Sequence, residues 1–424
     1  MRLTGRLVMA ALCACLAGAA ASAGAQTSDD LFDDQVLQRI DVHVNTRDWY
    51  WLKAESASNT YYTADLKWRG QTVRNVGLRS RGSASRSAVK PGLRVDINRY
   101  VTGQTFLGLT SFVLDNLETD ASCLREMLAM KLLRRMGVPA PREAFAALFV
   151  NNAFAGLYAV VESIDETAVD RLFGEHQGYL FEYQWTMVYN FEYLGAALEA
   201  YAPMFQPVNH KFDAPSTLYG PIEAMVRTIN DAPDPDFATS VEPYLDLGAF
   251  VRMAGGQAFL AEEDGLLGNW GVNNFYFYRF QGTTRSRFIA WDADHAMTAI
   301  DYDLTAGHNE SVLMRRVMQV PDLRAAYWAA VLEAAALADE AEEADAPGWL
   351  EREVVRFQAQ IGPAVRADTL KPYSDEEFEQ ASAYQMTFAR QRGAFVRCEV
   401  RRLGATNGVA APCSVPVGSA LRAK

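Results

Sequence analysis

The sequence is poor in the residues on which zinc and nucleophilic chemistry depend. Only five of its 424 residues are Cys and five are His, and they form no CxxC pair and no HExxH motif, which argues against a zinc site. The GxSxG turn of serine hydrolases is absent, as are the GxxxxGK[ST] and GxGxxG loops. Beyond residue 25, no apolar run approaches the roughly 20 residues that a membrane-spanning helix needs.

Positive charge is also in short supply. The 40 Lys and Arg are outnumbered by 52 Asp and Glu, which gives a net charge of −12. Such a surface argues against broad nucleic-acid binding, which needs a cationic footprint to neutralise phosphates. The length suits two or three structural units, or one large two-lobed domain. A small basic pocket for one phosphorylated ligand remains compatible with this balance.

The N-terminus has the pattern of a secretion signal. Arg2 and Arg6 precede an apolar run from Leu7 to about Leu16, and Ala23-Gly24-Ala25 fits the small-residue pattern before a cleavage site. We therefore expect residues 1–25 to be removed and the product to be exported to the periplasm or the cell exterior. In an oxidising compartment Cys398 and Cys413 could form a disulfide that pins the C-terminal tail. Cys123 stands in an apolar helical pattern and is predicted to be a buried thiol.

The chain divides into two halves of different character. Short apolar runs between turn residues predict strands in the first half, followed by one helix over Leu124–Met136 and a hairpin around Asn151-Asn152. The second half is mainly helical, with an apparent hairpin set into it around Gly282. The strands are expected at Arg39–Val44, Tyr62–Trp68, Gln71–Ser80, Leu93–Ile97 and Ser111–Leu114, and the later helices at Pro221–Ile229, Leu247–Glu262, Ala325–Glu343, Trp349–Ala367 and from Ser374 to about Arg402.

Two places in the first half could meet a phosphorylated ligand. The loop from Arg79 through Arg81 and Ser83 to Arg86 is rich in hydroxyls and guanidinium groups, which can wrap phosphates, and Lys90 follows it. A solvated surface hairpin is the competing interpretation. Glu126, at the start of the first long helix, could pair with Lys90 as a strand lysine and a helix glutamate do in protein kinases. The macrodipole alone would also favour an acid there.

Two places in the second half are rich in acids. Asp264 and Asn269 are five residues apart, which is the separation of the base and the metal-binding amide in a kinase catalytic loop. Asp292 and Asp294 directly follow an apolar strand and offer hard oxygen ligands for Mg²⁺ or Mn²⁺. Both patterns are also common in solvated turns. An EF-hand is excluded because Met297 stands where that loop needs Gly.

Taken together, these stretches resemble the CotH kinase family of atypical, kinase-like phosphotransferases. The most specific part is the block LREMLAMKLLRRMGVPAPR with the following LFVNNAFAGLYAVVESID. The stretches LRSRGSASRSAVK, NNFYFY and FIAWDAD corroborate it in the same order.

The resemblance implies an α+β fold of the bilobal, atypical protein-kinase type. Its N-lobe, residues 26–165, would be a mixed, largely antiparallel sheet with one helix, and its mainly helical C-lobe would cover residues 166–403, with a tail at 404–424. ATP would be held with Mg²⁺ or Mn²⁺, and phosphoryl would pass to Ser or Thr of an exported protein. The implied nucleotide-site residues are Arg79, Arg81, Ser83, Lys90, Glu126 and Glu162, the catalytic acid is Asp264, and the metal ligands are Asn269, Asp292 and Asp294, with Asn274 a further polar candidate.

A second class of function is consistent with the same sequence. An exported domain of this fold could serve as a non-catalytic surface-assembly or ligand-binding module. The acids Asp292, Asp294, Asp301 and Asp303 could then bind Ca²⁺ structurally. Transfer of AMP, or use of another nucleotide donor, is a further alternative.

Overall fold

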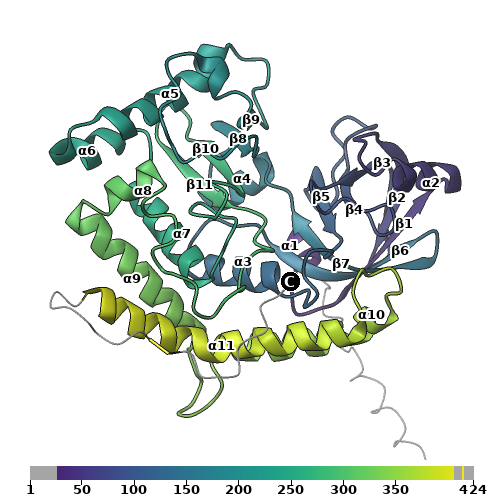
Figure 1. Ribbon diagram of the computed structural model, residues 1–424. Coiled ribbons are helices and arrows are strands. Elements are labelled where there is room, and N and C mark those ends of the chain that lie inside the picture. The colour runs from purple at the N-terminus through teal and green to yellow at the C-terminus, as the bar shows by residue number, and fades with distance from the viewer. Residues whose placement is uncertain (1–25, 405–412, 415–424) are drawn as a thin grey trace, which may run out of the picture.

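The computed structural model describes residues 26–404 and 413–414, and within them it has mixed α+β architecture. The predicted signal peptide, residues 1–25, lies outside the described residues. Figure 1 shows the strands of the first half gathered on one side and most helices on the other. Two hydrophobic cores correspond to these parts: one lies within residues 31–160, and a larger one extends from Val113 towards the C-terminus.

The first part is a closed seven-stranded barrel, in the order β1-β2-β3-β4-β5-β7-β6. All neighbouring strands are antiparallel except β1 and β6, whose parallel pairing closes the barrel. The strands are largely antiparallel, as predicted, but closure of the sheet into a barrel was not predicted, because a parallel pair joining residues 38–42 to 146–150 leaves no mark on the local sequence pattern. The strands are β1 (Gln38–Val44), β2 (Tyr62–Trp68), β3 (Gln71–Arg81), β4 (Gly92–Asp96), β5 (Ser111–Asp115), β6 (Glu143–Val150) and β7 (Ala153–Glu162).

The burial of successive residues along the barrel strands explains their hydrophobic patterns. In β1 buried and more exposed residues alternate, as expected for a strand with one face on a core. In β7 eight consecutive residues are buried, because the outer face of this region is covered as well. Phe145 of β6 packs edge-to-face on Phe357 of α10 (Trp349–Ala367), with ring centroids 5.3 Å apart.

The second part combines a four-stranded sheet, ordered β11-β10-β8-β9, with helices. The predicted hairpin is β10 (Phe275–Arg279) and β11 (Ser286–Ala290), and β8 (Tyr179–Tyr183) and β9 (Phe205–Pro207) extend it. The helices of the chain are α1 (Ser28–Leu31), α2 (Thr46–Ala54), α3 (Arg125–Arg135), α4 (Glu166–Phe173), α5 (Pro215–Asp231), α6 (Phe237–Val241), α7 (Leu247–Phe259), α8 (Val312–Val317), α9 (Pro321–Ala338), α10 and α11 (Asp375–Gly404).

Helix α7 packs closely between α3 and α9 because it carries two adjacent glycines. A Cβ on Gly255 would come within 2.8 Å of the Ala330 Cβ of α9, and one on Gly256 within 2.8 Å of a Leu133 methyl of α3. Contacts of that length are too short, so a larger residue at Gly255 would force α7 and α9 apart, and one at Gly256 would require the Leu133 side chain to move. Helix α3, which starts near the candidate site, is thereby fixed against the helical core.

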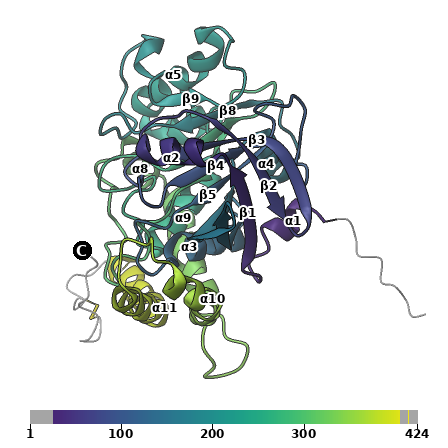
Figure 2. The same ribbon diagram turned by 90° about the vertical axis from the view of Figure 1, so that its right-hand side faces the viewer.

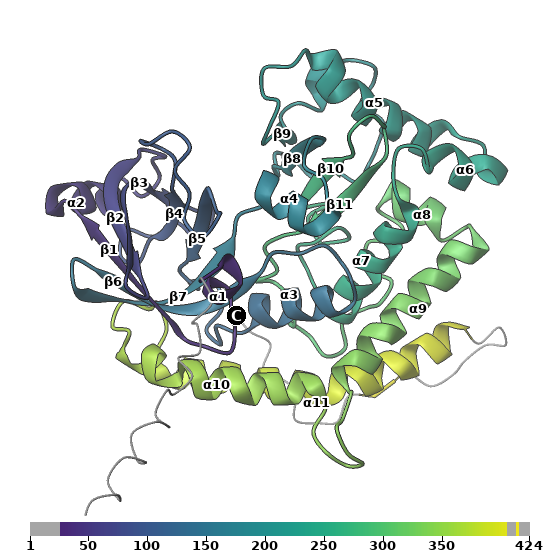
Figure 3. The same cartoon turned by 180° about the vertical axis from the view of Figure 1, so that it is seen from behind.

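Helices α10 and α11 lie side by side along the base of the molecule (Figures 1 and 3). Figure 2 shows the pair end-on beneath the barrel. The predicted capping box of α11 is formed: Ser374 Oγ accepts from the Glu377 N–H at 3.1 Å, and Glu377 accepts from the Ser374 N–H at 2.7 Å. These two helices lie beneath both the barrel and the helical part, and so connect them (Figures 1 and 2).

The cysteines lie as the sequence suggested. Cys398, near the end of α11, forms a disulfide with Cys413, and Cys123 is a buried free thiol. Within residues 26–404 and 413–414, no helix is long and apolar enough to cross a membrane.

Buried His308 makes stability sensitive to acid. Its ring packs edge-to-face on Tyr327 with centroids 5.0 Å apart, its Nε2 has no partner among the described residues, and burial lowers its pKa to about 4. Below pH 6.5 the unfolded chain takes up a proton that the folded chain refuses until about pH 4, so stability falls as pH falls through this window. We expect the unfolding free energy to drop by about 3 kcal/mol relative to a His308→Phe variant.

Urea unfolding of both proteins between pH 7 and pH 4 measures this difference. A difference in unfolding free energy between the two proteins that stays constant from pH 7 to pH 4 would contradict the prediction.

Candidate active site

Charged side chains from both parts of the molecule gather where the barrel meets the helical core. Arg81 and Asp115 are the last residues of β3 and β5, and Glu143 is the first residue of β6. Glu126 lies in the first turn of α3. The loops that follow α7 and β11 add Asp264, Asp292 and Asp294.

Arg81 is the cation nearest to Asp115 and Asp292 in this group. Its Nη1 lies 3.3 Å from Asp115 Oδ2, and its guanidinium lies 5.3 Å from the centre of the Trp291 ring. Burial acts to lower the pKa of Arg81, but the charges of Asp292, Asp115 and Glu126 outweigh it and raise the pKa. Arg81 is therefore the guanidinium that the nearby acids share.

Asp264 is held by two amides. Asn273 Nδ2 donates to both of its carboxylate oxygens at 3.1 Å, and Asn274 Nδ2 donates to Oδ2 at 3.0 Å. Its own N–H donates to Glu262 at 2.9 Å. Burial raises the pKa of Asp264, against the lowering effect of the Asn273 hydrogen bond. The carboxylate is thus oriented by neutral donors and keeps its basicity, which suits a proton acceptor.

Asp292 and Asp294 follow β11 in a constrained turn. Asp292 has a φ of 51°, in the left-handed region that non-glycine residues adopt uncommonly. Burial and then the charge of Asp294 raise the pKa of Asp292 well above its usual value. Burial likewise raises the pKa of Asp294, while the Thr119 hydroxyl, which donates to Oδ2, lowers it. The two carboxylates destabilise each other's charge.

Glu126 and Glu143 face a small enclosed cavity. The cavity holds about 10 Å³, the room of one water molecule, and is lined by Asp115, Thr119, Asp294 and these two acids among others. Glu143 is 1% exposed and neither of its carboxyl oxygens has a partner among the described residues. Burial raises its pKa to about 8, and burial with repulsion from Glu143 raises that of Glu126 well above normal.

Lys90 is not part of this group, which corrects the sequence interpretation. Its Nζ pairs with Asp368 Oδ2 at 2.8 Å, and the two side chains are 2% and 1% exposed. Asp368 caps the end of α10 and also accepts the Leu157 N–H at 3.0 Å. The structure therefore pairs Lys90 with Asp368 rather than with Glu126, because α10 brings a buried carboxylate to it from the base of the molecule.

Three more predicted nucleotide-site residues have other surroundings. Glu162 is 1% exposed and forms ion pairs with Arg142 at 2.6 Å and Arg171 at 2.5 Å. Arg79 donates to Asn59 at 3.0 Å, and Ser83 is exposed. Of the predicted basic loop, Arg81 is the residue that reaches the acidic group.

Asn269 also lies apart from its predicted place. It is exposed, and its backbone N–H donates to Glu263 at 2.7 Å. The amides beside Asp264 are instead those of Asn273 and Asn274. Among the residues that the structure describes, no three His, Cys, Asp or Glu side chains converge as metal ligands. The tetrad of Asp292, Asp294, Asp301 and Asp303 is therefore not assembled.

Sequence reasoning missed Asp115, Glu143, Glu262 and Thr119. The sequence contained a signal for Asp115 and Glu143, because Asp115 ends an apolar strand and Glu143 begins one. An acid next to a buried strand is not explained by solvent exposure. Glu262 follows an apolar helix and gave the same kind of signal. Thr119 gave none, since its contact with Asp294 joins residues far apart in sequence.

The fold and the site together define an α+β protein in which a barrel and a helical core meet at an acid-rich centre that contains Arg81. Comparison with known proteins agrees: the family model described as CotH kinase protein matches residues 78–396. The chain belongs to the CotH kinase protein family. It is also 22% identical over 333 residues to the inner spore coat protein H of Bacillus subtilis (strain 168), an alignment covering 76% of this chain and 86% of that protein.

Proposed function

We propose that this protein is an exported phosphotransferase that moves the γ-phosphoryl group of ATP to a Ser or Thr hydroxyl of an exported protein. Membership of the CotH kinase family supports kinase-like activity. The observation that carries the proposal is Asp264, a half-buried carboxylate that is held by two amides and lies near the further acid Asp294. We retain a bilobal, kinase-like organisation, with lobes at residues 26–165 and 166–403, as part of this proposal.

The roles follow from the chemistry of each group. Asp264 would accept the proton of the attacking hydroxyl. Arg81 would contact the phosphates in the role that the sequence had assigned to Lys90, because it is the cation next to Asp292 and Glu126. Glu126 would contribute negative charge from α3, which helps to keep Arg81 protonated. Phosphoryl transfer of this kind depends on positioning and charge neutralisation and needs no covalent enzyme intermediate.

Asp292 and Asp294 are also suited to bind a divalent cation. Asp292 and Asp294 offer hard oxygen ligands, and burial together with repulsion from Asp294 raises the pKa of Asp292. Mg²⁺ in nucleotide sites is usually bound through one or two carboxylates together with phosphates, so a set of three protein acids is not required. We propose that these two residues hold Mg²⁺ or Mn²⁺, which would neutralise phosphate charge.

The proposal is tested by phosphoryl transfer from γ-³²P-labelled ATP to the protein itself and to casein, with Mg²⁺ or Mn²⁺. We expect transfer by the wild type and its loss in the Asp292→Ala variant. Thermal shift provides the second measurement: ligand at ~100 times its Kd adds ~2.7 kcal/mol of stability. Stabilisation by Ca²⁺ alone, with neither a nucleotide effect nor transfer, would favour a non-catalytic module.

A further inference from the structure

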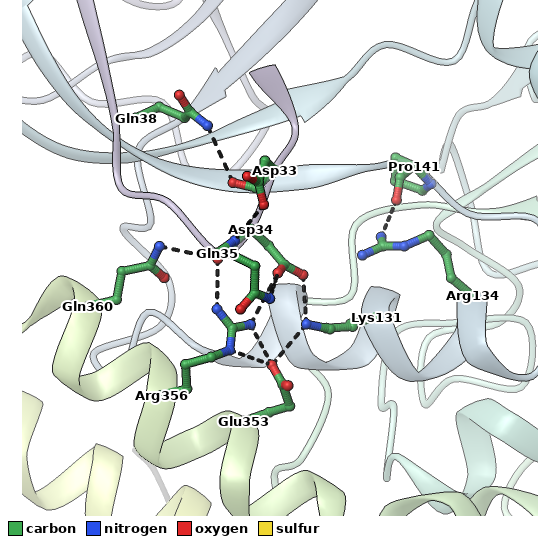
Figure 4. Close-up of polar contacts among 10 residues, drawn as sticks. All are labelled: Asp33, Asp34, Gln35, Gln38, Lys131, Arg134, Pro141, Glu353, Arg356 and Gln360. Carbon is green, nitrogen blue, oxygen red and sulfur yellow. Dashed lines mark hydrogen bonds and ion pairs between the residues drawn. The ribbon is translucent and has the colours of Figure 1, made fainter. Parts of the chain in front are cut away.

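Asp34, near the N-terminus of the described chain, belongs to a network of ion pairs with residues that are far from it in the sequence. Asp34 stands between α1 and β1, and Figure 4 shows it facing side chains of α3 and α10. Its Oδ2 lies 2.8 Å from Lys131 Nζ of α3, and its Oδ1 lies 3.3 Å from Arg356 Nη2 of α10. One carboxylate thus joins the N-terminal segment to two helices.

The network is closed and electrically balanced. Lys131 also pairs with Glu353 at 2.9 Å, and Glu353 pairs with Arg356 at 2.5 Å. The backbone oxygen of Asp34 accepts from Arg356 at 2.8 Å and from Gln360 at 3.1 Å. Two cations therefore face two anions, and the four charged side chains are between 13% and 25% exposed. Partial burial makes such pairs stronger than exposed ones, and makes the loss of one partner costly.

Helix α3 is the element that this network holds nearest to the candidate site. At its start, Asp120 Oδ2 accepts the backbone N–H groups of Leu124 and Arg125 at 2.8 and 2.9 Å, which fixes the first turn and Glu126 within it. About one and a half turns later, Lys131 is held by Asp34 and Glu353. The two anchors set both the position of the helix along its axis and its rotation.

We propose that Asp34 is a positioning residue, which acts through Lys131 to hold α3 so that Glu126 stays against the small cavity that Asp115, Glu143 and Asp294 also line. The activity part of this inference rests on the proposed function. Replacing Asp34 leaves Lys131 and Arg356 facing Glu353 alone, so Lys131 loses one of its two partners and holds α3 less firmly, while the cap by Asp120 remains. The site then spends more of its time with Glu126 displaced.

The test compares Asp34→Asn with Asp33→Asn, a neighbouring change outside the network, in the full mature chain. Hydrogen exchange is measured in the α3 segment Leu124–Arg135, and phosphoryl transfer at varied ATP. For Asp34→Asn we expect exchange in α3 to be about tenfold faster and kcat about tenfold lower, with KM for ATP changed less than twofold. Asp33→Asn should match the wild type in both measurements.

A Lys131→Met variant completes a double-mutant cycle. Because Asp34 acts through Lys131, the double variant should be no slower than the Lys131→Met single variant. Additive losses, or unchanged α3 exchange in Asp34→Asn, would overturn the inference. If the wild type itself transfers no phosphoryl group, the proposed function fails, and the exchange measurement alone decides whether Asp34 positions α3.

Discussion

Replacing Asp264 by Asn should abolish most phosphoryl transfer and leave the fold intact. A positioned general base contributes on the order of 10²–10⁴ in rate, so kcat should fall by about that factor. Burial raises the pKa of the carboxylate, and the amide oxygen of Asn can take the place of Oδ2 and still accept from Asn273 and Asn274. The fold should therefore be retained at the cost of about one hydrogen bond. The measurement is single-turnover transfer from labelled ATP, with thermal unfolding alongside.

Two matched variants define the specificity of this result. Asp301→Asn removes an exposed acid of the same region and should retain wild-type transfer. Asn269→Ala should also retain it, whereas Asn274→Ala removes a donor to Asp264 and should slow it. Transfer by Asp264→Asn at the wild-type rate would rule out this residue as the proton acceptor.

Replacing Lys90 by Met should destabilise the protein strongly. The change leaves Asp368, 1% exposed, without its cation, and breaking a buried ion pair by removing one partner costs about 3–5 kcal/mol. The site cannot relax easily, because Gly156 packs against Asp368 so closely that a Cβ would lie 2.5 Å from its oxygen. Urea unfolding at pH 7 measures the loss.

The exposed pair Arg366–Glu379 provides the control on the same helix. Its side chains are 52% and 66% exposed, so Arg366→Met should change stability by less than about 1 kcal/mol. The double variant Lys90→Met/Asp368→Asn removes both charges and should recover part of the lost stability. A Lys90→Met protein as stable as the wild type, but inactive, would return Lys90 to a catalytic role.

The local sequence pattern was sufficient to predict most strands and long helices. Strand β2 and helix α10 have the bounds that the alternation and the helical spacing predicted, because each element carries its own periodicity. Short elements such as α2, β9 and α8 were missed, since a few residues carry too little periodic signal. The closing pair β1–β6 was missed because it depends on a contact between distant strands.

The same limit applied to the candidate site. The structure brings Arg81, Glu126, Asp264, Asp292 and Asp294 into one region, all of which the sequence had singled out. The pairing of Lys90 could not be predicted, because its partner Asp368 lies at the far end of α10 and nothing in its neighbourhood reads as functional. Motif spacing suggested Asn269 beside Asp264, whereas the amides that donate to Asp264 are those of Asn273, which was not predicted, and of Asn274, which was named as a further polar candidate.

The Lys90–Asp368 pair also bears on how the chain can mature during synthesis. The strands of the barrel are complete once residue 162 has been made, but the carboxylate that neutralises Lys90 belongs to a segment translated much later. Until α10 emerges, a cation stands uncompensated on the barrel and the outer face of β6 and β7 lacks its cover. A nascent barrel is therefore an incomplete folding unit, and fragments that end before residue 368 should be poor substitutes for the whole chain.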